Sequence, residues 1–234
     1  MYKGKKLSLV FPAYNEEKNI KNAIADFKNL AIVDEILVID NKSTDNTHKI
    51  AKKSGAIVVT ESNQGYGFAL RRGLRTAKGD YVVLCEPDGT FDAKDIFRLL
   101  RHIENADMVQ GSRTHKNYIK AGANLGFLLR TGNIVVAKLM QTLYHTNKLT
   151  DCGCTFRILK STLIKKILPS LKVGESHFLP ELVIITAINK GKIIEIPVNY
   201  KQRIGNSKIT GSMTRAFFVC LQMLYIICSY KFRR

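Results

Sequence analysis

Two carboxylates stand at the end of an apolar run in the middle of the chain. The run from Tyr81 to Cys85 is typical of a buried strand, and Glu86 and Asp88 follow it directly. Pro87 between them has no backbone donor, so we expect the strand to stop there. Hard oxygen ligands at the carboxyl end of a central strand suit a divalent cation and a phosphate-bearing ligand. This stretch alone favours an acidic strand-to-helix turn that binds nothing, because short motifs often match by chance.

Further polar side chains follow two other apolar runs. Asn15 and Glu16 come shortly after residues 7–11, a run that Pro12 closes, and the run 35–40 itself ends in a carboxylate, Asp40. Runs of this kind are typical of buried parallel strands. Ligands in open parallel sheets bind at the carboxyl ends of the strands, so these groups are expected to meet at one site.

The elements that position these residues alternate along the chain. We expect strands over 7–11, 35–40, 56–60, 81–85 and 107–111, and helices over 16–27, 43–51, 67–77 and 95–103. Asp92 is a candidate cap for the helical turn that follows it. Such alternation predicts an α/β fold with a mostly parallel sheet. In the second half we expect a turn-rich stretch over 151–157, helices over 125–143, 162–168 and 178–188, and a strand over 193–198.

The chain is strongly basic, with 37 Lys and Arg against 19 Asp and Glu and a formal net charge of +18. This charge indicates an anionic partner, which could be nucleic acid, an anionic membrane surface or a phosphorylated substrate. Aromatic residues do not interleave with the basic ones and no binding module is recognisable, so we expect no nucleic acid. Five scattered cysteines predict reduced thiols in a cytosolic chain, and the start of the sequence predicts no signal peptide.

The last apolar stretch, residues 213–230, is expected to form a helix followed by Lys231, Arg233 and Arg234. Its 18 residues would measure roughly 27 Å, slightly less than a bilayer core of about 30 Å. We expect this helix to lie in the membrane interface, held by apolar burial and by its basic flank. A membrane-spanning helix and a helix packed on the domain are the two alternatives.

Four stretches, in this order and spacing, resemble the family 2 glycosyltransferases with the GT-A fold, in particular the polyprenyl-phosphate (dolichol-phosphate) mannosyltransferase-like branch. They are residues 12–16, 40–47, 63–73 and 86–88, and weaker matches continue to residue 208. The resemblance implies a Rossmann-like GT-A domain with a mostly parallel sheet over residues 1–208, and the apolar and basic residues after it predict a membrane-associating segment over residues 209–234.

The resemblance also implies a nucleotide-sugar donor, a GDP- or UDP-hexose. Glu86 and Asp88 would replace the family's Asp-x-Asp motif and hold Mg²⁺ or Mn²⁺ on the donor diphosphate, where the metal neutralises charge on the leaving group. Two residues depart from the usual pattern: Glu86 stands for an Asp, and Asn41 stands where many relatives carry Asp. The implied donor-binding residues are Pro12, Tyr14, Glu16, Ile39, Asp40, Asn41, Glu86, Pro87, Asp88 and Thr90.

The acceptor implied by the resemblance is a polyprenyl phosphate. Guanidinium groups bind phosphate oxygens in bidentate fashion, and the candidates are Arg113, Arg130, Arg203, Ser207 and Lys208. A lipid phosphate is already ionised and needs no general base, whereas a sugar hydroxyl would need a carboxylate to take its proton. Glu181 is the candidate base, with Asp151 in reserve, and the alternative for Glu181 is an acid on a helix surface. The catalytic candidates are Asp88, Arg113 and Glu181.

The function expected from the resemblance is inverting transfer of a hexose from a nucleotide-sugar to a polyprenyl phosphate at the cytoplasmic face of the cell membrane. The alternative is a family 2 transferase that acts on a saccharide hydroxyl in cell-surface glycan synthesis. Gly65 and Gly67 do not form a dinucleotide fingerprint, because Leu70 stands at its last position and the third strand precedes it. The Gly-rich N-terminal loop of a sugar-nucleotide pyrophosphorylase is also missing from the sequence.

Overall fold

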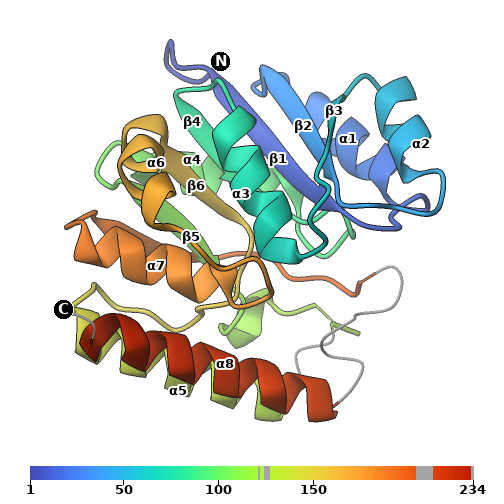
Figure 1. The fold of residues 1–234 in the computed structure, drawn as a ribbon. Coiled ribbons are helices and arrows are strands. Elements are labelled where there is room, and N and C mark those ends of the chain that lie inside the picture. The colour runs from blue at the N-terminus through green and yellow to red at the C-terminus, as the bar shows by residue number, and fades with distance from the viewer. Residues whose placement is uncertain (121, 124–126, 204–212, 233–234) are drawn as a thin grey trace.

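The structure is a computed structural model that describes residues 1–120, 122–123, 127–203 and 213–232. Within these residues a seven-stranded sheet runs in the order β3-β2-β1-β4-β6-β5-β7 (Figure 1). Strand β6 is antiparallel to both of its neighbours, and the other pairs are parallel. The strands are β1 Leu7–Ala13, β2 Glu35–Asp40, β3 Ile57–Thr60, β4 Tyr81–Leu84, β5 Met108–Ser112, β6 Arg157–Lys160 and β7 Ile193–Pro197.

Helices cover both faces of the sheet, which explains why the strands read as continuous apolar runs. Leu9 and Phe11 of β1 pack into the core cluster with α1, α2 and α4, and Val10 between them packs into the cluster with α3, α5, α6, α7 and α8, as the two-residue period of a strand requires. The helices are α1 Ile20–Lys28, α2 Thr47–Lys53, α3 Tyr66–Thr76, α4 Ile96–Ile103, α5 Phe127–Tyr144, α6 Ser161–Ile167, α7 Phe178–Ile188 and α8 Met213–Phe232, with short 3-10 turns at Ala93–Asp95, Lys116–Tyr118 and Leu168–Ser170.

The predicted alternation of strands and helices is confirmed, with bounds that shift by a few residues. Asp92 caps its helical turn as expected, because its carboxylate accepts a hydrogen bond from the Lys94 amide at 3.1 Å. Two strand predictions were wrong in detail. β1 continues through Pro12 to Ala13, and the antiparallel strand β6 was not predicted at all, because its four residues begin with a buried arginine, Arg157, rather than an apolar side chain.

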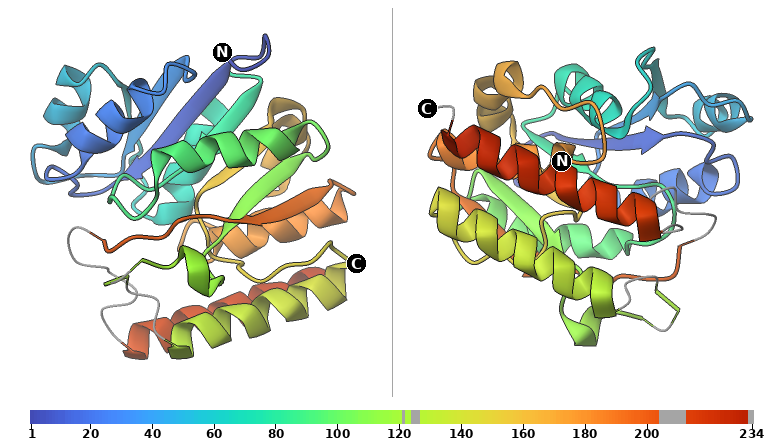
Figure 2. Two further views of the ribbon diagram at one scale, coloured as in Figure 1. Left: turned by 180° about the vertical axis from the view of Figure 1, so that it is seen from behind. Right: turned by 60° about the horizontal axis from the view of Figure 1, so that its bottom comes forward.

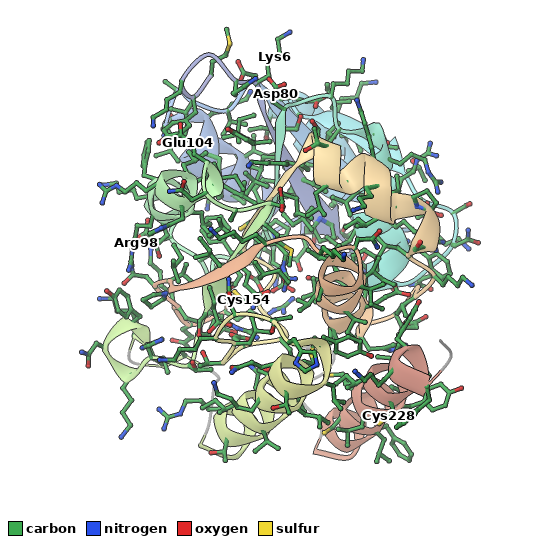
Figure 3. The ribbon with its side chains drawn as sticks, turned by 90° about the vertical axis from the view of Figure 1, so that its left-hand side faces the viewer. Lys6, Asp80, Arg98, Glu104, Cys154 and Cys228 are labelled. Carbon is green, nitrogen blue, oxygen red and sulfur yellow. The ribbon has the colours of Figure 1, made fainter. Side chains whose placement is uncertain are left out.

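The predicted C-terminal helix is present as α8, and it lies beside α5 at one border of the molecule (Figures 1 and 2). One face packs on the domain: Ile226 and Ile227 are buried, and the Tyr144 hydroxyl donates to the carbonyl of Ile227. The other face is exposed, as Figure 3 illustrates with Cys228, whereas Cys154 lies in the interior. Among the described residues no helix combines the length and the apolarity needed to cross a bilayer. The packed alternative therefore holds for one face of this helix.

Candidate active site

The loops that follow β1 and β2 are joined by short polar contacts. Asp40, at the end of β2, is buried, and its carboxylate accepts from the Ser43 amide at 3.0 Å and lies 3.1 Å from His48 Nδ1. The Asn15 side chain accepts from the Thr44 amide at 2.8 Å, and its backbone has a positive φ of 56°. Left-handed backbone at a non-glycine residue is uncommon and concentrates at functional loops. The two strand ends therefore form one ordered rim.

Asn41 is buried, and its amide has partners at both ends. Its nitrogen donates to the carbonyls of Asn63 and Glu61 at 2.8 and 3.3 Å, and its oxygen accepts from the Gly65 amide at 2.8 Å. The side chain thus holds the loop between β3 and α3 against the end of β2. Ile39, also a predicted donor contact, is fully buried in the core. Asn41 and Ile39 are thus buried side chains that support the rim, and direct contact of either with the donor stays a prediction.

Asp88 is 1% exposed and lies in a turn that it shapes itself. Its Oδ1 accepts from the amide and the hydroxyl of Thr90, at 3.0 and 2.6 Å. Its Oδ2 is buried and has no hydrogen-bond partner in the described part of the chain, and the Arg203 guanidinium lies 3.2 Å from it. A buried carboxylate oxygen that is held only by a nearby cation is a candidate ligand for a metal ion.

Glu86 lies beside Asp88 and has a different set of partners. Its Oε1 accepts from the Tyr66 hydroxyl at 3.0 Å and from the Thr155 hydroxyl at 3.1 Å. Burial, together with the negative charge of Asp88, raises the pKa of Glu86 to about 7. Two carboxylates this close repel one another, and a cation between them would relieve that repulsion.

The residues present fit a divalent cation that is shared with a ligand. The described residues contain no group of three or more His, Cys, Asp or Glu side chains that could hold a metal by themselves. Glu86 and Asp88 offer two carboxylates, and Mg²⁺ is commonly bound by one or two carboxylates together with substrate phosphates and waters. The donor set therefore suits a metal carried on a diphosphate better than a site built from protein ligands alone.

Arg203 reaches this site from the far end of the chain. Its Nη1 lies 3.2 Å from Asp88, and its Nη2 lies 3.3 Å from Oε1 of Glu16. Burial raises the pKa of Glu16, although Arg203 and Asn19 oppose that shift. Arg203 was predicted in the acceptor-phosphate group. The structure places it between two predicted donor-site carboxylates, and its role toward the acceptor stays a prediction. Ser207 and Lys208, predicted beside it, lie outside the described residues.

Arg113 is bound to Asp151 rather than left open. Its Nε and Nη2 lie 2.8 and 2.9 Å from the two carboxylate oxygens, and Asp151 also accepts from Asn133 at 2.6 Å. Asp151 is completely buried, which by itself would raise its pKa, but the charge of Arg113 and the hydrogen bonds from Arg113 and Asn133 together outweigh burial and lower the pKa to about 2. This pair leaves Asp151 poorly suited to accept a proton. Arg130 is half-buried one helical turn before Asn133, and its Nε has no partner within the described residues.

Glu181, the candidate base, is fully buried on α7 and has three donors. It accepts from the amides of Lys172 and Val173, both at 2.9 Å, and from the Tyr230 hydroxyl at 2.7 Å. The alternative of an acid on the helix surface was wrong, because the side chain points into the protein. The three donors reach both carboxylate oxygens, so Glu181 is engaged within the protein.

Sequence reasoning missed the hydroxyl groups that hold Glu86. Tyr66 stands at the start of α3 and Thr155 precedes β6, and their oxygens lie 2.5 Å from each other. Tyr66 falls within one of the four stretches that resemble the family, and Thr155 falls within the weaker matches that follow them. No spacing rule, however, links positions 20 and 69 residues away from Glu86 with its carboxylate, so nothing in the sequence marked their side chains.

Comparisons with known proteins bear on the family and the fold of the chain. A family model described as "Glycosyl transferase family 2" matches residues 8–168. An uncharacterised glycosyltransferase of Mycobacterium tuberculosis (strain ATCC 25618 / H37Rv) is 29% identical over 96% of this chain and 99% of its own length. A dolichyl-phosphate beta-glucosyltransferase of Dictyostelium discoideum is 27% identical over 97% of this chain and 74% of its own. Glucosyl-3-phosphoglycerate synthase from Mycobacterium tuberculosis, solved with Mn²⁺, UDP-glucose and phosphoglyceric acid, has a TM-score of 0.74 at 22% identity, over 97% of this chain and 80% of its own.

Proposed function

Because the chain belongs to glycosyl transferase family 2, we propose that it moves a hexose from a nucleotide-sugar to a polyprenyl phosphate of the dolichyl type, with inversion. The chain is a glycosyltransferase with the GT-A fold. The observation that supports the proposed site most directly is Asp88 at the carboxyl end of β4, where a buried carboxylate oxygen lies 3.2 Å from the Arg203 guanidinium and makes no hydrogen bond to the described residues.

The proposed donor is a UDP-hexose bound through Mg²⁺ or Mn²⁺. A structural relative was solved with Mn²⁺ and UDP-glucose, and Glu86 and Asp88 offer the two carboxylates that such a complex needs. A bound divalent cation would neutralise the charge that grows on the leaving diphosphate. In this proposal the rim formed after β1 and β2 holds the nucleoside end of the donor.

The proposed acceptor is a lipid phosphate, and two observations favour it over a hydroxyl group. A relative acts on dolichyl phosphate, according to its name. The two candidate bases are both engaged, Asp151 by Arg113 and Glu181 by three donors. An ionised phosphate oxygen attacks without a general base, whereas a hydroxyl does not. Arg130, half-buried with one nitrogen unpartnered in the described chain, is the candidate contact for that phosphate.

We further propose that α8 rests on the cytoplasmic face of the membrane. Its exposed face carries large apolar side chains: Phe218 (60% exposed), Leu221 (45%), Tyr225 (69%) and Phe232 (81%). We call these four residues the apolar stripe. An apolar stripe on a chain with a net charge of +18 suits an anionic bilayer surface, where apolar burial and electrostatic attraction add.

The proposal is tested by offering both acceptor classes to the purified protein. Labelled UDP- and GDP-hexoses are supplied with Mn²⁺, together with vesicles that contain a short polyprenyl phosphate or with soluble saccharides. The proposal expects label in the lipid fraction from one donor, with loss of that label after EDTA treatment. Label that enters a saccharide or another hydroxyl acceptor, and no lipid, would overturn the lipid-phosphate acceptor and keep the glycosyltransferase.

A further inference from the structure

A hydrogen bond joins the C-terminal helix to the buried acid of α7. The hydroxyl of Tyr230 on α8 donates to Oε1 of Glu181 at 2.7 Å. The same carboxylate accepts from two consecutive backbone amides, those of Lys172 and Val173. Glu181 therefore ties three pieces of chain together: α7, α8 and the segment 171–175 that precedes α7. A buried carboxylate needs these donors, since an unpaired charge in this environment is costly.

The segment 171–175 in turn packs on the first turn of α3. The Phe68 amide donates to the carbonyl of Gly174 at 3.0 Å. A Cβ atom on Gly65 would lie 2.4 Å from that same carbonyl oxygen, and one on Gly67 would lie 2.6 Å from the carbonyl oxygen of Val173. Both glycines therefore permit a backbone approach that no other residue would allow. The start of α3 cannot move independently of this segment.

The first residue of α3 is Tyr66, whose hydroxyl donates to Glu86. A chain of contacts therefore runs from α8 to the predicted metal site. It passes from Tyr230 to Glu181, then through the amides of the segment 171–175 to the start of α3, and from Tyr66 to Glu86. Each step is a hydrogen bond or a close backbone contact between described residues.

We propose that Tyr230 and Glu181 are positioning residues for the donor site. By fixing the segment 171–175 against α3, they hold the Tyr66 hydroxyl on Glu86, and so set the orientation of that carboxylate before a donor arrives. The inference rests on the proposed role of Glu86 in donor binding. In this proposal α8 helps to order the donor site, and Glu181 has a positioning role in place of proton transfer.

The test removes one oxygen atom from α8. Tyr230→Phe deletes the hydroxyl that reaches Glu181, and Ser229→Ala deletes a hydroxyl on the same helical turn that bonds to the carbonyl of Ile226 in its own helix. Hydrogen exchange of the folded, ligand-free variants is measured in peptides that cover residues 171–175 and 65–68. We expect faster exchange in both segments for Tyr230→Phe and wild-type exchange for Ser229→Ala.

The second readout is the donor. Loss of one buried hydrogen bond should weaken Mn²⁺-dependent UDP binding by about threefold to tenfold in Tyr230→Phe, and should raise the donor KM more than it lowers kcat. A variant that merely loses part of its folded population would lose kcat at unchanged KM. Glu181→Gln keeps the side-chain volume but removes the charge that accepts the backbone donors. It must show the faster exchange expected for Tyr230→Phe over residues 171–175 and 65–68.

Two results separate this inference from the proposed function. If the wild type binds UDP and Tyr230→Phe binds it equally well with unchanged exchange over 65–68, the positioning role is wrong and the donor site stands. If the wild type binds no nucleotide, the proposed function fails. In that event, faster hydrogen exchange over residues 65–68 in Tyr230→Phe still supports the coupling between α8 and the start of α3. Unchanged exchange over these residues overturns it.

Discussion

The ion pair between Arg113 and Asp151 gives a prediction whose size follows from the structure. Asp151 is completely buried and accepts from Arg113 three times, through Nε, Nη2 and the backbone amide, and from Asn133 and the Gly153 amide once each. Asp151→Asn preserves the volume of the side chain. It removes the charge, and it turns one acceptor into a donor that faces other donors, so the partly buried Arg113 guanidinium loses its counter-charge.

The pKa of Asp151 gives the smaller limit of the effect, and the loss of one partner from a buried pair gives the larger value. The pKa of Asp151 falls from 3.8 to about 2 on folding, and each pKa unit is worth about 1.4 kcal/mol, so ionisation of this group contributes about 2 kcal/mol at neutral pH. Breaking a buried pair by removing one partner typically costs about 3–5 kcal/mol, because the remaining charge is uncompensated. We therefore expect Asp151→Asn to lower the free energy of unfolding by about 3–5 kcal/mol at pH 7.

The pH dependence has a definite sign. The folded pKa of Asp151 lies below its unfolded value, so its contribution is fully present above about pH 4 and is lost as the pH falls toward about 2. Urea denaturation followed by circular dichroism at pH 7 and at steps down to pH 3 measures both effects, with the exposed Asp26→Asn as the control. The ion pair does not contribute as described if Asp151→Asn loses less than about 1 kcal/mol of the free energy of unfolding at pH 7. The same holds if this free energy falls equally between pH 4 and 3 in the variant and in the wild type.

Two further predictions concern the donor site and the apolar stripe. Arg203→Ala should destabilise the metal-free protein by about 1–3 kcal/mol, because the buried Asp88 carboxylate loses its neighbouring cation. In urea denaturation, Mn²⁺ should raise the free energy of unfolding of this variant more than that of the wild type. Equal increases in the two proteins would contradict the pairing of Arg203 with Asp88. Phe218→Ser with Phe232→Ser should weaken cosedimentation with anionic vesicles by at least about tenfold, whereas Ile57→Ser, which removes an exposed apolar side chain from β3, should not. Equal losses in both proteins would argue against α8 as the membrane contact.

The gathering of polar groups at the carboxyl ends of β1, β2 and β4 was predictable from the sequence. Each run is apolar throughout because helices cover both faces of the sheet, and each is followed at once by polar residues, so a parallel sheet brings those residues to one edge. Asp40, Glu86 and Asp88 were found in this way. Strand β6 was not predicted, because it is short and starts with Arg157, a buried residue whose side chain donates to the carbonyl of Cys154.

The partners of the charged residues could not be predicted. The family resemblance predicted Arg113 and Arg203 as phosphate ligands, yet the structure pairs Arg113 with a carboxylate 38 positions later and Arg203 with one 187 positions earlier. Glu181 was marked by its place in a family pattern, and its donors come from two segments that only the tertiary fold brings together. The near-uniform apolarity of α8 also hid the fact that one face is packed, because the exposed face is apolar too.

The central claim is that Glu86 and Asp88 bind a nucleoside diphosphate through a divalent cation. The most direct test is calorimetric titration of UDP into the wild type and into Asp88→Asn, each with Mn²⁺ and with EDTA. We expect binding by the wild type in Mn²⁺ alone, and at least about a tenfold loss of affinity in Asp88→Asn, since a metal ligand has been removed. UDP that binds equally well in EDTA, or equally well to Asp88→Asn, would contradict the metal site at the end of β4.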